Sequence, residues 1–426
     1  MKIIKRLLMM ILVMWMAVGI VFPMTASASV SIQSGVPTPL TLGTDSDTPT
    51  IVGFGGYEWM IVGHNDPTNV FNTPNNAMTL LARNQNFGSA AFNSDTSVNP
   101  SYKTGELFTA MNTAFNNINT ANSKEGNLVL PRDIQAKDSG SGTENVANQK
   151  FWPLSTDEAN ALYSNTVRSF SNTWWLRSPD GPGGAVLVFG TGEVIAWGFW
   201  VLNSEAVRPA FNLDLSSVVF TSDAAGGKPV GTLGNMSSST APSGAVKFTF
   251  RDTSLSKPNI TITSGNGTDS ITFNYTLAQT TGMNRISATL EQNPITHYGV
   301  MTDAPSTSGT FTLNMAGISP GTYKLYFFSE QVNGDNLSDF VSAFTSFTLI
   351  VNADGTGTIT TGGGGGTGGG GGSTDTGEAQ HNIPQTSDSN NLTAMRIMMF
   401  ISIIGIIGTL IVTTVFIKRN YGKKSA

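Results

Sequence analysis

The chain has 426 residues, a formal net charge of −5 and no cysteine. Between residues 29 and 386 it carries 15 Lys and Arg against 27 Asp and Glu, a net charge of about −12. An acidic surface repels phosphate backbones, so nucleic acid is excluded as a partner class. The lack of cysteine excludes disulfides, thiol nucleophiles and thiolate metal sites, so stability must come from hydrophobic cores.

The N-terminal segment has the layout of a secretory leader. Basic residues precede an apolar run at 7–21, and small residues follow at 26–28. A signal peptidase recognises this order. We therefore expect residues 1–28 to be a signal peptide that is cleaved between Ala28 and Ser29, and the protein to be exported.

The segment 31–222 mixes strand and helix patterns and is predicted to form a head domain. Strands are predicted at 51–54, 57–62 and 77–81. Apolar residues at three- and four-residue spacing predict a helix within 103–119. A second helix is predicted to begin at Ser155, where Glu158 completes a capping box.

After residue 222 the helical patterns stop. Seven short strand-like segments with turn signals between them follow from 246 to 351. This pattern predicts an immunoglobulin-like β-sandwich at 240–352, acting as a spacer or packing partner. The tract 361–372 then contains ten glycines, and we predict a flexible linker at 353–382.

The C-terminal segment 383–426 is predicted to anchor the protein. Residues 397–417 contain no charge, and at about 1.5 Å per residue they are long enough to cross a bilayer core of about 30 Å. Lys and Arg follow this run, which predicts a transmembrane helix with its C-terminus in the cytoplasm.

A short motif precedes the apolar run. Its sequence is Ile383-Pro384-Gln385-Thr386-Ser387-Asp388. Motif, apolar run and basic tail together resemble the cell-wall sorting signal of Gram-positive surface proteins. The resemblance implies that sortase cleaves between Thr386 and Ser387 and joins the protein to peptidoglycan. A single-pass membrane protein is the alternative.

The segment 174–212 combines aromatic residues with turn-rich backbone, a pattern typical of binding surfaces. A hairpin is predicted with strands at 185–189 and 193–197 around Gly190-Thr191-Gly192. Trp174 and Trp175 are predicted to be core. The aromatic residues at 189–200 either bind ligand or face the core as well.

Few residues offer chemistry. The three histidines are isolated, so no metal site is predicted. The sequence also offers no assembled nucleophile or carboxylate pair, so no cofactor and no enzymatic activity are predicted. Arg177 and Arg208 are predicted to form structural ion pairs, with Glu58 or Asp214 as partners.

Lys247 and Asn352 lie near the two ends of the predicted sandwich. Their residue types and positions suggest that they could form a self-made amide cross-link of the kind known in Gram-positive surface domains.

Several motifs carry a further resemblance. They are Tyr57-Glu58-Trp59, Trp152-Pro153-Leu154-Ser155, the segment 174–179, the segment 207–215 and Gly321-Thr322-Tyr323. In this order they resemble an uncharacterised domain that is widespread on Gram-positive surface proteins. That domain is similar to C-type-lectin-like modules related to the formylglycine-generating enzyme, and to variable proteins that display changeable side chains on a fixed scaffold.

The resemblance implies a set of displayed, ligand-binding side chains. They are Phe189, Ile195, Ala196, Trp197, Phe199, Trp200, Leu202, Asn203, Ser204 and Glu205. The calcium-binding signatures of sugar-binding lectins are absent.

Together, these features predict an α+β protein with a C-type-lectin-like mixed head domain, an immunoglobulin-like β-sandwich, a Gly-rich linker and one C-terminal transmembrane helix. We expect a cell-surface adhesin or receptor-like display protein that binds an extracellular protein or glycan through residues 180–206. An envelope glycan-processing enzyme and a passive structural surface protein are the alternatives.

Overall fold

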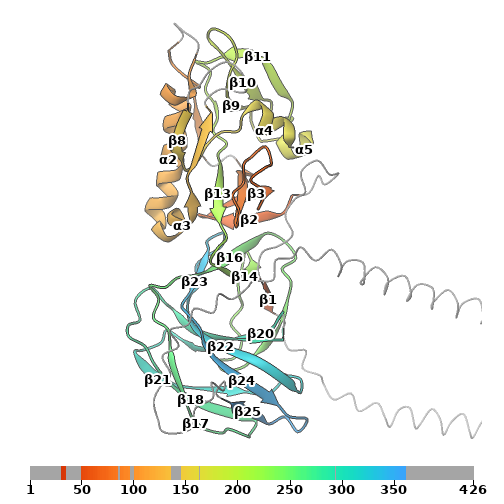
Figure 1. Cartoon of the computed structure of the whole chain (residues 1–426), viewed down its shortest axis with the longest axis vertical. Coiled ribbons are helices and arrows are strands. Elements are labelled where there is room, and N and C mark those ends of the chain that lie inside the picture. Colours follow the sequence, from red (N-terminus) through yellow and green to blue (C-terminus); the bar gives the residue numbers. More distant parts are fainter. Residues whose placement is uncertain are drawn as a thin grey trace, which may run out of the picture. The chain divides into compact units, whose positions relative to one another are not determined.

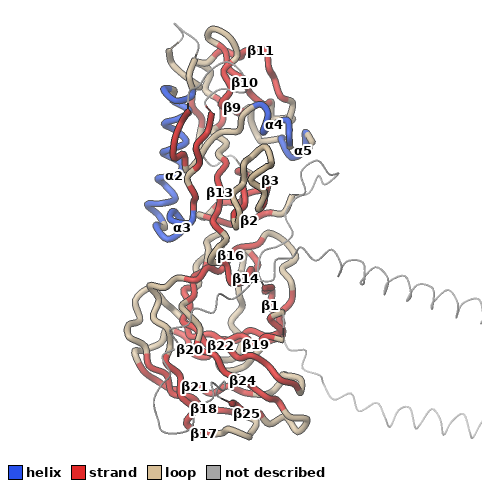
Figure 2. Tube along the Cα trace, in the orientation of Figure 1, coloured by secondary structure: helices blue, strands red, loops and turns tan. Residues whose placement is uncertain are grey.

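The computed structural model describes residues 30–34, 49–84, 87–95, 100–135, 145–162, 164–292 and 294–360. Strands contain 47% and helices 12% of these residues, so the fold is mostly β and the predicted α+β class is wrong. All the described helices end before residue 169 (Figure 2). Most of them span only one or two turns, whereas strands continue through the rest of the described chain.

The helices follow the predicted local signals. They are η1 (Tyr102–Thr104), α2 (Glu106–Ala121), α3 (Ser123–Leu128), α4 (Thr156–Ala161) and α5 (Asn165–Arg168). Helix α2 buries Leu107, Met111, Ala114 and Ile118 at three- and four-residue spacing, as predicted. At the start of α4, Ser155 and Glu158 form the predicted capping box.

One long sheet runs through most of the described chain (Figure 1). In spatial order its strands are β25 (Gly357–Thr360), β24 (Thr345–Val351), β22 (Gly321–Gln331), β19 (Arg285–Glu291), β20 (Ile295–Asp303), β15 (Ser237–Thr240), β1 (Val30–Ser34), β14 (Val218–Asp223), β16 (Val246–Arg251), β2 (Ile51–Phe54), β3 (Tyr57–His64), β4 (Ala77–Ala82), β13 (Ala210–Asp214) and β6 (Val129–Leu130). A short strand, β23 (Asp339–Val341), pairs with both β16 and β22.

Three smaller sheets complete the described part. A five-stranded sheet has the order β11 (Val194–Trp200), β10 (Gly184–Val188), β9 (Trp174–Pro179), β12 (Glu205–Ala206) and β5 (Ser89–Ala90). A three-stranded sheet has the order β17 (Asn259–Ser264), β18 (Ser270–Thr276) and β21 (Ser308–Asn314). The last sheet pairs β7 (Arg132–Gln135) with β8 (Asn145–Gln149).

The three-stranded sheet packs against the long sheet. Phe273 on β18 and Phe327 on β22 lie with ring centroids 5.1 Å apart, inside a core cluster that draws residues from both sheets. Strands β17, β18 and β21 therefore form a layer that faces β19, β22 and β24, and most of the strands predicted there are present. Strand β16, predicted as the first strand of the immunoglobulin-like sandwich, instead buries its apolar residues in the core cluster of the preceding region, so the predicted separate sandwich is wrong. Strand β20 was not predicted, because His297 and Gly299 interrupt its apolar pattern.

The predicted border near residue 222 does not divide the long sheet. Strand β16 pairs in parallel with β2 through Val246 and Val52. Across the same border, Glu125 Oε1 of α3 accepts hydrogen bonds from the amide of Gly55, on its own side, at 3.2 Å and from that of Ser338, on the other side, at 2.7 Å. The helix-containing and all-strand regions thus share both a sheet and buried hydrogen bonds.

The predicted linker begins too early. Strand β25 pairs with β24 inside the range 353–382, because Thr358 and Ile359 continue the alternating pattern before the glycine tract. Within the described residues, no helix is long and apolar enough to span a membrane. The expected signal peptide with Ala28 and Ser29, the sorting motif with Thr386 and Ser387, and the apolar run at 397–417 lie outside the described residues.

Candidate functional site

The predicted hairpin is present as β10 and β11. Val188 pairs with Val194 in an antiparallel register, and residues 189–193 form the turn. Gly192 in this turn has a φ of +90°, a conformation that side-chain-bearing residues rarely adopt. A Cβ atom at Gly192 would lie 2.0 Å from the carbonyl oxygen of Asn165, so glycine is required for both reasons.

Strand β11 contains a bulge that the sequence pattern did not reveal. Leu187 pairs with Ile195 and Ala185 with Phe199, so four residue steps on β11 face two steps on β10. Residues 196–198 thus lie opposite the single residue Val186, two more than regular pairing gives, and Gly198 among them has a φ of +64°. A β-bulge removes residues from the ladder and turns their side chains in new directions.

The bulge determines which side chains reach solvent. Simple alternation would place Trp197 on the same face as Ile195, but Ile195 is fully buried whereas Trp197 is 70% exposed. Trp200, at the end of β11, is 55% exposed, and Leu202 in the following turn is 46% exposed. We call Trp197, Trp200 and Leu202 the β11 surface. Ile195 does not belong to it, which corrects the predicted set.

The β11 surface lies on an edge strand and rests on a rigid base. Strand β11 is the outermost strand of its five-stranded sheet. The ring of Trp200 lies over Gly183, where a Cβ atom would be 3.4 Å from the ring. Phe189 and Phe199 are half-buried and pack edge to face with centroids 5.8 Å apart. These contacts hold the exposed residues on packed backbone and aromatic side chains.

Polar members of the predicted set border the β11 surface in sequence. Asn203 and Ser204 are exposed, and Glu205 on β12 is half-buried. Burial raises the pKa of the Glu205 carboxyl above its usual range. The segment therefore offers amide, hydroxyl and carboxyl groups next to exposed apolar area.

The two tryptophans of β9 belong to the core, as predicted. Trp174 and Trp175 are fully buried. The indole nitrogen of Trp175 donates to the carbonyl oxygen of Ala90 at 3.1 Å, and the indole nitrogen of Trp174 donates to the carbonyl oxygen of Arg168 at 3.3 Å. Both rings support the sheet that carries β11 and are not available to a ligand.

The predicted partners of Arg177 were wrong. Its guanidinium binds Glu158, with Nη1 2.5 Å from Oε2 and Nη2 3.0 Å from Oε1. Glu58 instead contacts Arg83 at 3.0 Å. The capping signal alone had explained Glu158, but its carboxylate also serves as the counter-charge that a buried arginine needs.

Arg208 forms no ion pair with the described residues. Its guanidinium donates to the carbonyl oxygens of Ala82 at 3.0 Å, Arg168 at 2.6 Å and Val167 at 3.3 Å. Its Cζ atom also lies 4.6 Å from the ring centroids of both Phe170 and Trp174. Burial lowers the pKa of Arg208 to about 9, so the group stays charged at neutral pH and is stabilised by dipoles and rings.

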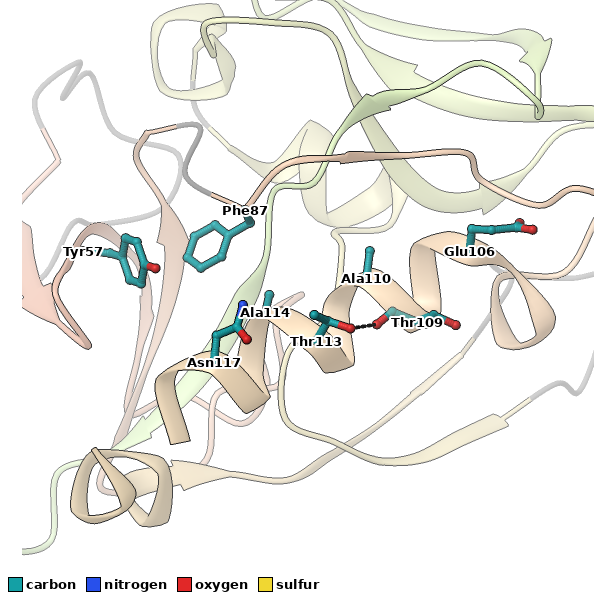
Figure 3. A pocket seen from close by; sticks show the side chains of 8 residues that line it. All are labelled: Tyr57, Phe87, Glu106, Thr109, Ala110, Thr113, Ala114 and Asn117. Atoms are coloured by element: carbon teal, nitrogen blue, oxygen red, sulfur yellow. Dashed lines mark hydrogen bonds between the residues drawn. The ribbon is translucent and has the colours of Figure 1, made fainter. Parts of the chain in front are cut away.

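A shallow pocket of about 340 Å³ lies beside α2 (Figure 3). Tyr57 and Phe87 form one side, and Thr109, Thr113 and Asn117 project from the helix. Among the described residues that line the pocket, Glu106 is the one carboxylate. It accepts a hydrogen bond from the Ser94 amide at 2.7 Å, and hydrogen bonding to Ser94, chiefly to its side chain, lowers the pKa of Glu106. The pocket therefore lacks the pair of carboxylates that glycoside hydrolysis uses.

Lys247 and Asn352 do not meet. The Lys247 ammonium lies in a buried cluster, where it donates to Asp339 Oδ1 at 2.9 Å. Asn352 lies in an exposed turn and donates to Thr356 Oγ1 at 2.9 Å. The predicted cross-link between these two residues is therefore wrong, because the strand registers carry them to different places.

Comparison with known families covers the segment that holds the β11 surface. Residues 75–215 match a family model described as "Domain of unknown function (DUF6273)". The match includes the Trp-Trp-Leu-Arg-Ser-Pro and Val-Arg-Pro-Ala-Phe motifs but spans less than half of the chain. No curated protein and no solved structure matches the chain. Function must therefore be argued from the site itself.

Proposed function

We propose that the chain is an exported cell-surface protein that binds an extracellular protein or glycan through the β11 surface. The observation that carries this proposal is the exposure of Trp197 and Trp200, at 70% and 55%, within a chain whose other described tryptophans are fully buried. Tryptophan supplies a large apolar contact area with a polar N–H group and is enriched among the residues that dominate binding energy at interfaces.

The local structure supports binding in two further ways. Packed residues hold the β11 surface in place, so little conformational entropy is lost when a partner binds. An indole ring can stack on the apolar face of a sugar or fill an apolar pocket of a protein. The neighbouring amide of Asn203 and carboxyl of Glu205 could then supply directional hydrogen bonds.

The two alternatives receive less support. A passive structural role does not account for two exposed indoles on one edge strand. A glycan-processing enzyme would need a general acid and a second carboxylate or nucleophile near each other, and the pocket beside α2 offers one carboxylate that is already hydrogen-bonded.

The proposal is tested by screening the purified, labelled chain on glycan and extracellular-protein arrays. We expect a defined set of ligands for the wild-type chain and a loss of about tenfold or more in affinity for Trp197→Ala and Trp200→Ala. Leu233→Ala is the matched control, because Leu233 is 47% exposed and lies outside the family match.

Circular dichroism must show that each variant stays folded. An unchanged array profile for the folded double variant Trp197→Ala/Trp200→Ala would refute the proposal. An equal loss for Leu233→Ala would show that the binding is non-specific and would refute it too.

A further inference from the structure

Four charged side chains meet in a dry cluster where β16, β22 and β23 come together. Lys228 follows β14, Lys247 lies on β16, Glu330 on β22 and Asp339 on β23. None of the four is more than 2% exposed. Burying four charges together is expensive, even when they pair, because each loses its hydration.

The two oxygens of Asp339 have different surroundings. Oδ1 accepts hydrogen bonds from the Asn333 amide at 2.7 Å and from Lys247 Nζ at 2.9 Å. Oδ2 is in hydrogen-bond contact with Lys228 Nζ. Two donors on Oδ1 would stabilise negative charge on that oxygen if the carboxyl carbon were attacked from the Oδ2 side.

The two lysines also differ. The Lys247 ammonium also donates hydrogen bonds to the carbonyl oxygens of Asn333 and Gly334, at 3.0 and 3.3 Å. Lys228 instead contacts Thr249 Oγ1 at 3.0 Å and Glu330 Oε1 at 3.1 Å. Lys228 is therefore the amine that touches both carboxylates, whereas Lys247 is held as a cation beside Oδ1.

Glu330 is placed to exchange a proton with Lys228. Its Oε2 accepts hydrogen bonds from Tyr298 Oη and Ser287 Oγ, each at 2.7 Å. Its Oε1 faces Lys228 and receives no aligned hydrogen bond from the described residues. A buried carboxylate within reach of an amine is the arrangement that general acid-base catalysis needs.

We propose that Lys228 Nζ and Asp339 Cγ become joined by an intramolecular amide bond, with Glu330 as the acid-base group. The Lys228 ammonium gives one proton to Glu330, and the neutral amine attacks Cγ while Lys247 and the Asn333 amide stabilise the charge on Oδ1. The new Nζ–Cγ bond forms and the Cγ–Oδ2 bond breaks. Glu330 transfers two amine protons in turn to Oδ2, which leaves as water, and Glu330 ends as the carboxylate.

The product removes one cation and one anion from a site without solvent. Lys247 and Glu330 remain as one pair of opposite charges, and Oδ1 keeps both of its donors as the amide oxygen. The bond would join segments 111 residues apart, and so would tie the loop after β14 to β23 in the folded and unfolded chain alike.

The test is the mass of the purified full-length chain, followed by peptide mapping after denaturation and proteolysis. We expect the wild-type mass to be lower than the sequence mass by one water molecule, after correction for any N-terminal processing. Mapping should give a branched peptide that joins Lys228 to Asp339.

Two variants examine the chemistry. Lys228→Arg keeps the positive charge but cannot form the bond under these conditions, so it should show the full mass. Glu330→Gln keeps the shape but cannot take the proton, so bond formation should be slower by roughly 100-fold or more.

A wild-type chain at full mass would overturn the proposal whether or not the variants fold. A water loss that maps to ring closure at Asp180-Gly181 or Asp354-Gly355 would also overturn it, as would a branched peptide containing Lys247. Each of these outcomes is independent of ligand binding by the β11 surface.

Discussion

Arg177 on β9 and Glu158 on α4 form a buried, bidentate ion pair, with Nη1 2.5 Å from Oε2 and Nη2 3.0 Å from Oε1. Arg132 Nη2 lies 2.9 Å from Glu158 Oε1, so one carboxylate faces two guanidinium groups. Glu158 also caps α4 through the amide of Ser155. This carboxylate therefore connects α4 and β7 to the sheet whose edge carries the β11 surface.

The substitution Glu158→Gln distinguishes the contribution of the ion pair to stability from that of the helix cap. Glutamine can still complete a capping box, but it leaves Arg177 and Arg132 buried without a counter-charge. We expect a loss of about 3 kcal/mol in unfolding free energy, measured by urea denaturation. Asp157→Asn, at the exposed neighbouring position, is the control and should change stability by less than about 0.5 kcal/mol. Equal effects of the two substitutions would contradict the role given to the buried pair.

The same carboxylate should make stability depend on acid pH. Burial raises the pKa of Glu158, but the charges of Arg177 and Arg132 outweigh burial and the net pKa lies below the usual 4.5. Stability from Glu158 is therefore complete above about pH 4.5 and is lost as the pH falls through the lower folded-state pKa. Because other carboxyls titrate in this range, the quantity to measure is the difference in Tm between wild type and Glu158→Gln. That difference should shrink from pH 7 to pH 3, and a constant difference would contradict the assignment.

Two glycine substitutions compare the destabilisation caused by a steric clash together with backbone strain and that caused by backbone strain alone. Gly192 and Gly181 both have positive φ, at +90° and +69°, but only Gly192 has a neighbouring atom where a Cβ would lie. We expect Gly192→Ala to cost about 3 kcal/mol and Gly181→Ala about 1 kcal/mol in unfolding free energy. Thermal unfolding of the two variants measures this. If Gly181→Ala were the more harmful substitution, the hairpin turn would differ from the one described.

Fluorescence quenching tests the exposure of the β11 surface without any ligand. Iodide does not enter the protein core, and Trp59, Trp152, Trp174 and Trp175 are fully buried. We expect the double variant Trp197→Phe/Trp200→Phe to lose most of the iodide quenching of the wild-type chain, with little change in Tm. Quenching that persists at the wild-type level would mean that these two indoles are not the exposed ones.

Local sequence determined much of the fold. The apolar spacing of α2, the capping box at Ser155, the β10–β11 hairpin and most strands after residue 246 depend on short-range propensities. Such patterns are readable because neighbouring residues decide them. The burial of Trp174 and Trp175 also followed from their place in an apolar strand.

Only the tertiary structure decided the rest. The partner of Arg177 depends on how α4 docks against β9, and the Lys228 to Asp339 contact depends on a strand that lies 111 residues later. Both Ile195 and Trp197 were expected to be displayed, but the bulge on β11 leaves Ile195 buried and only Trp197 exposed, because strand register is set by pairing across the sheet and not by alternation along one strand. Residue types and local periodicity identified the segment that carries the site, whereas long-range pairing chose which of its side chains face water.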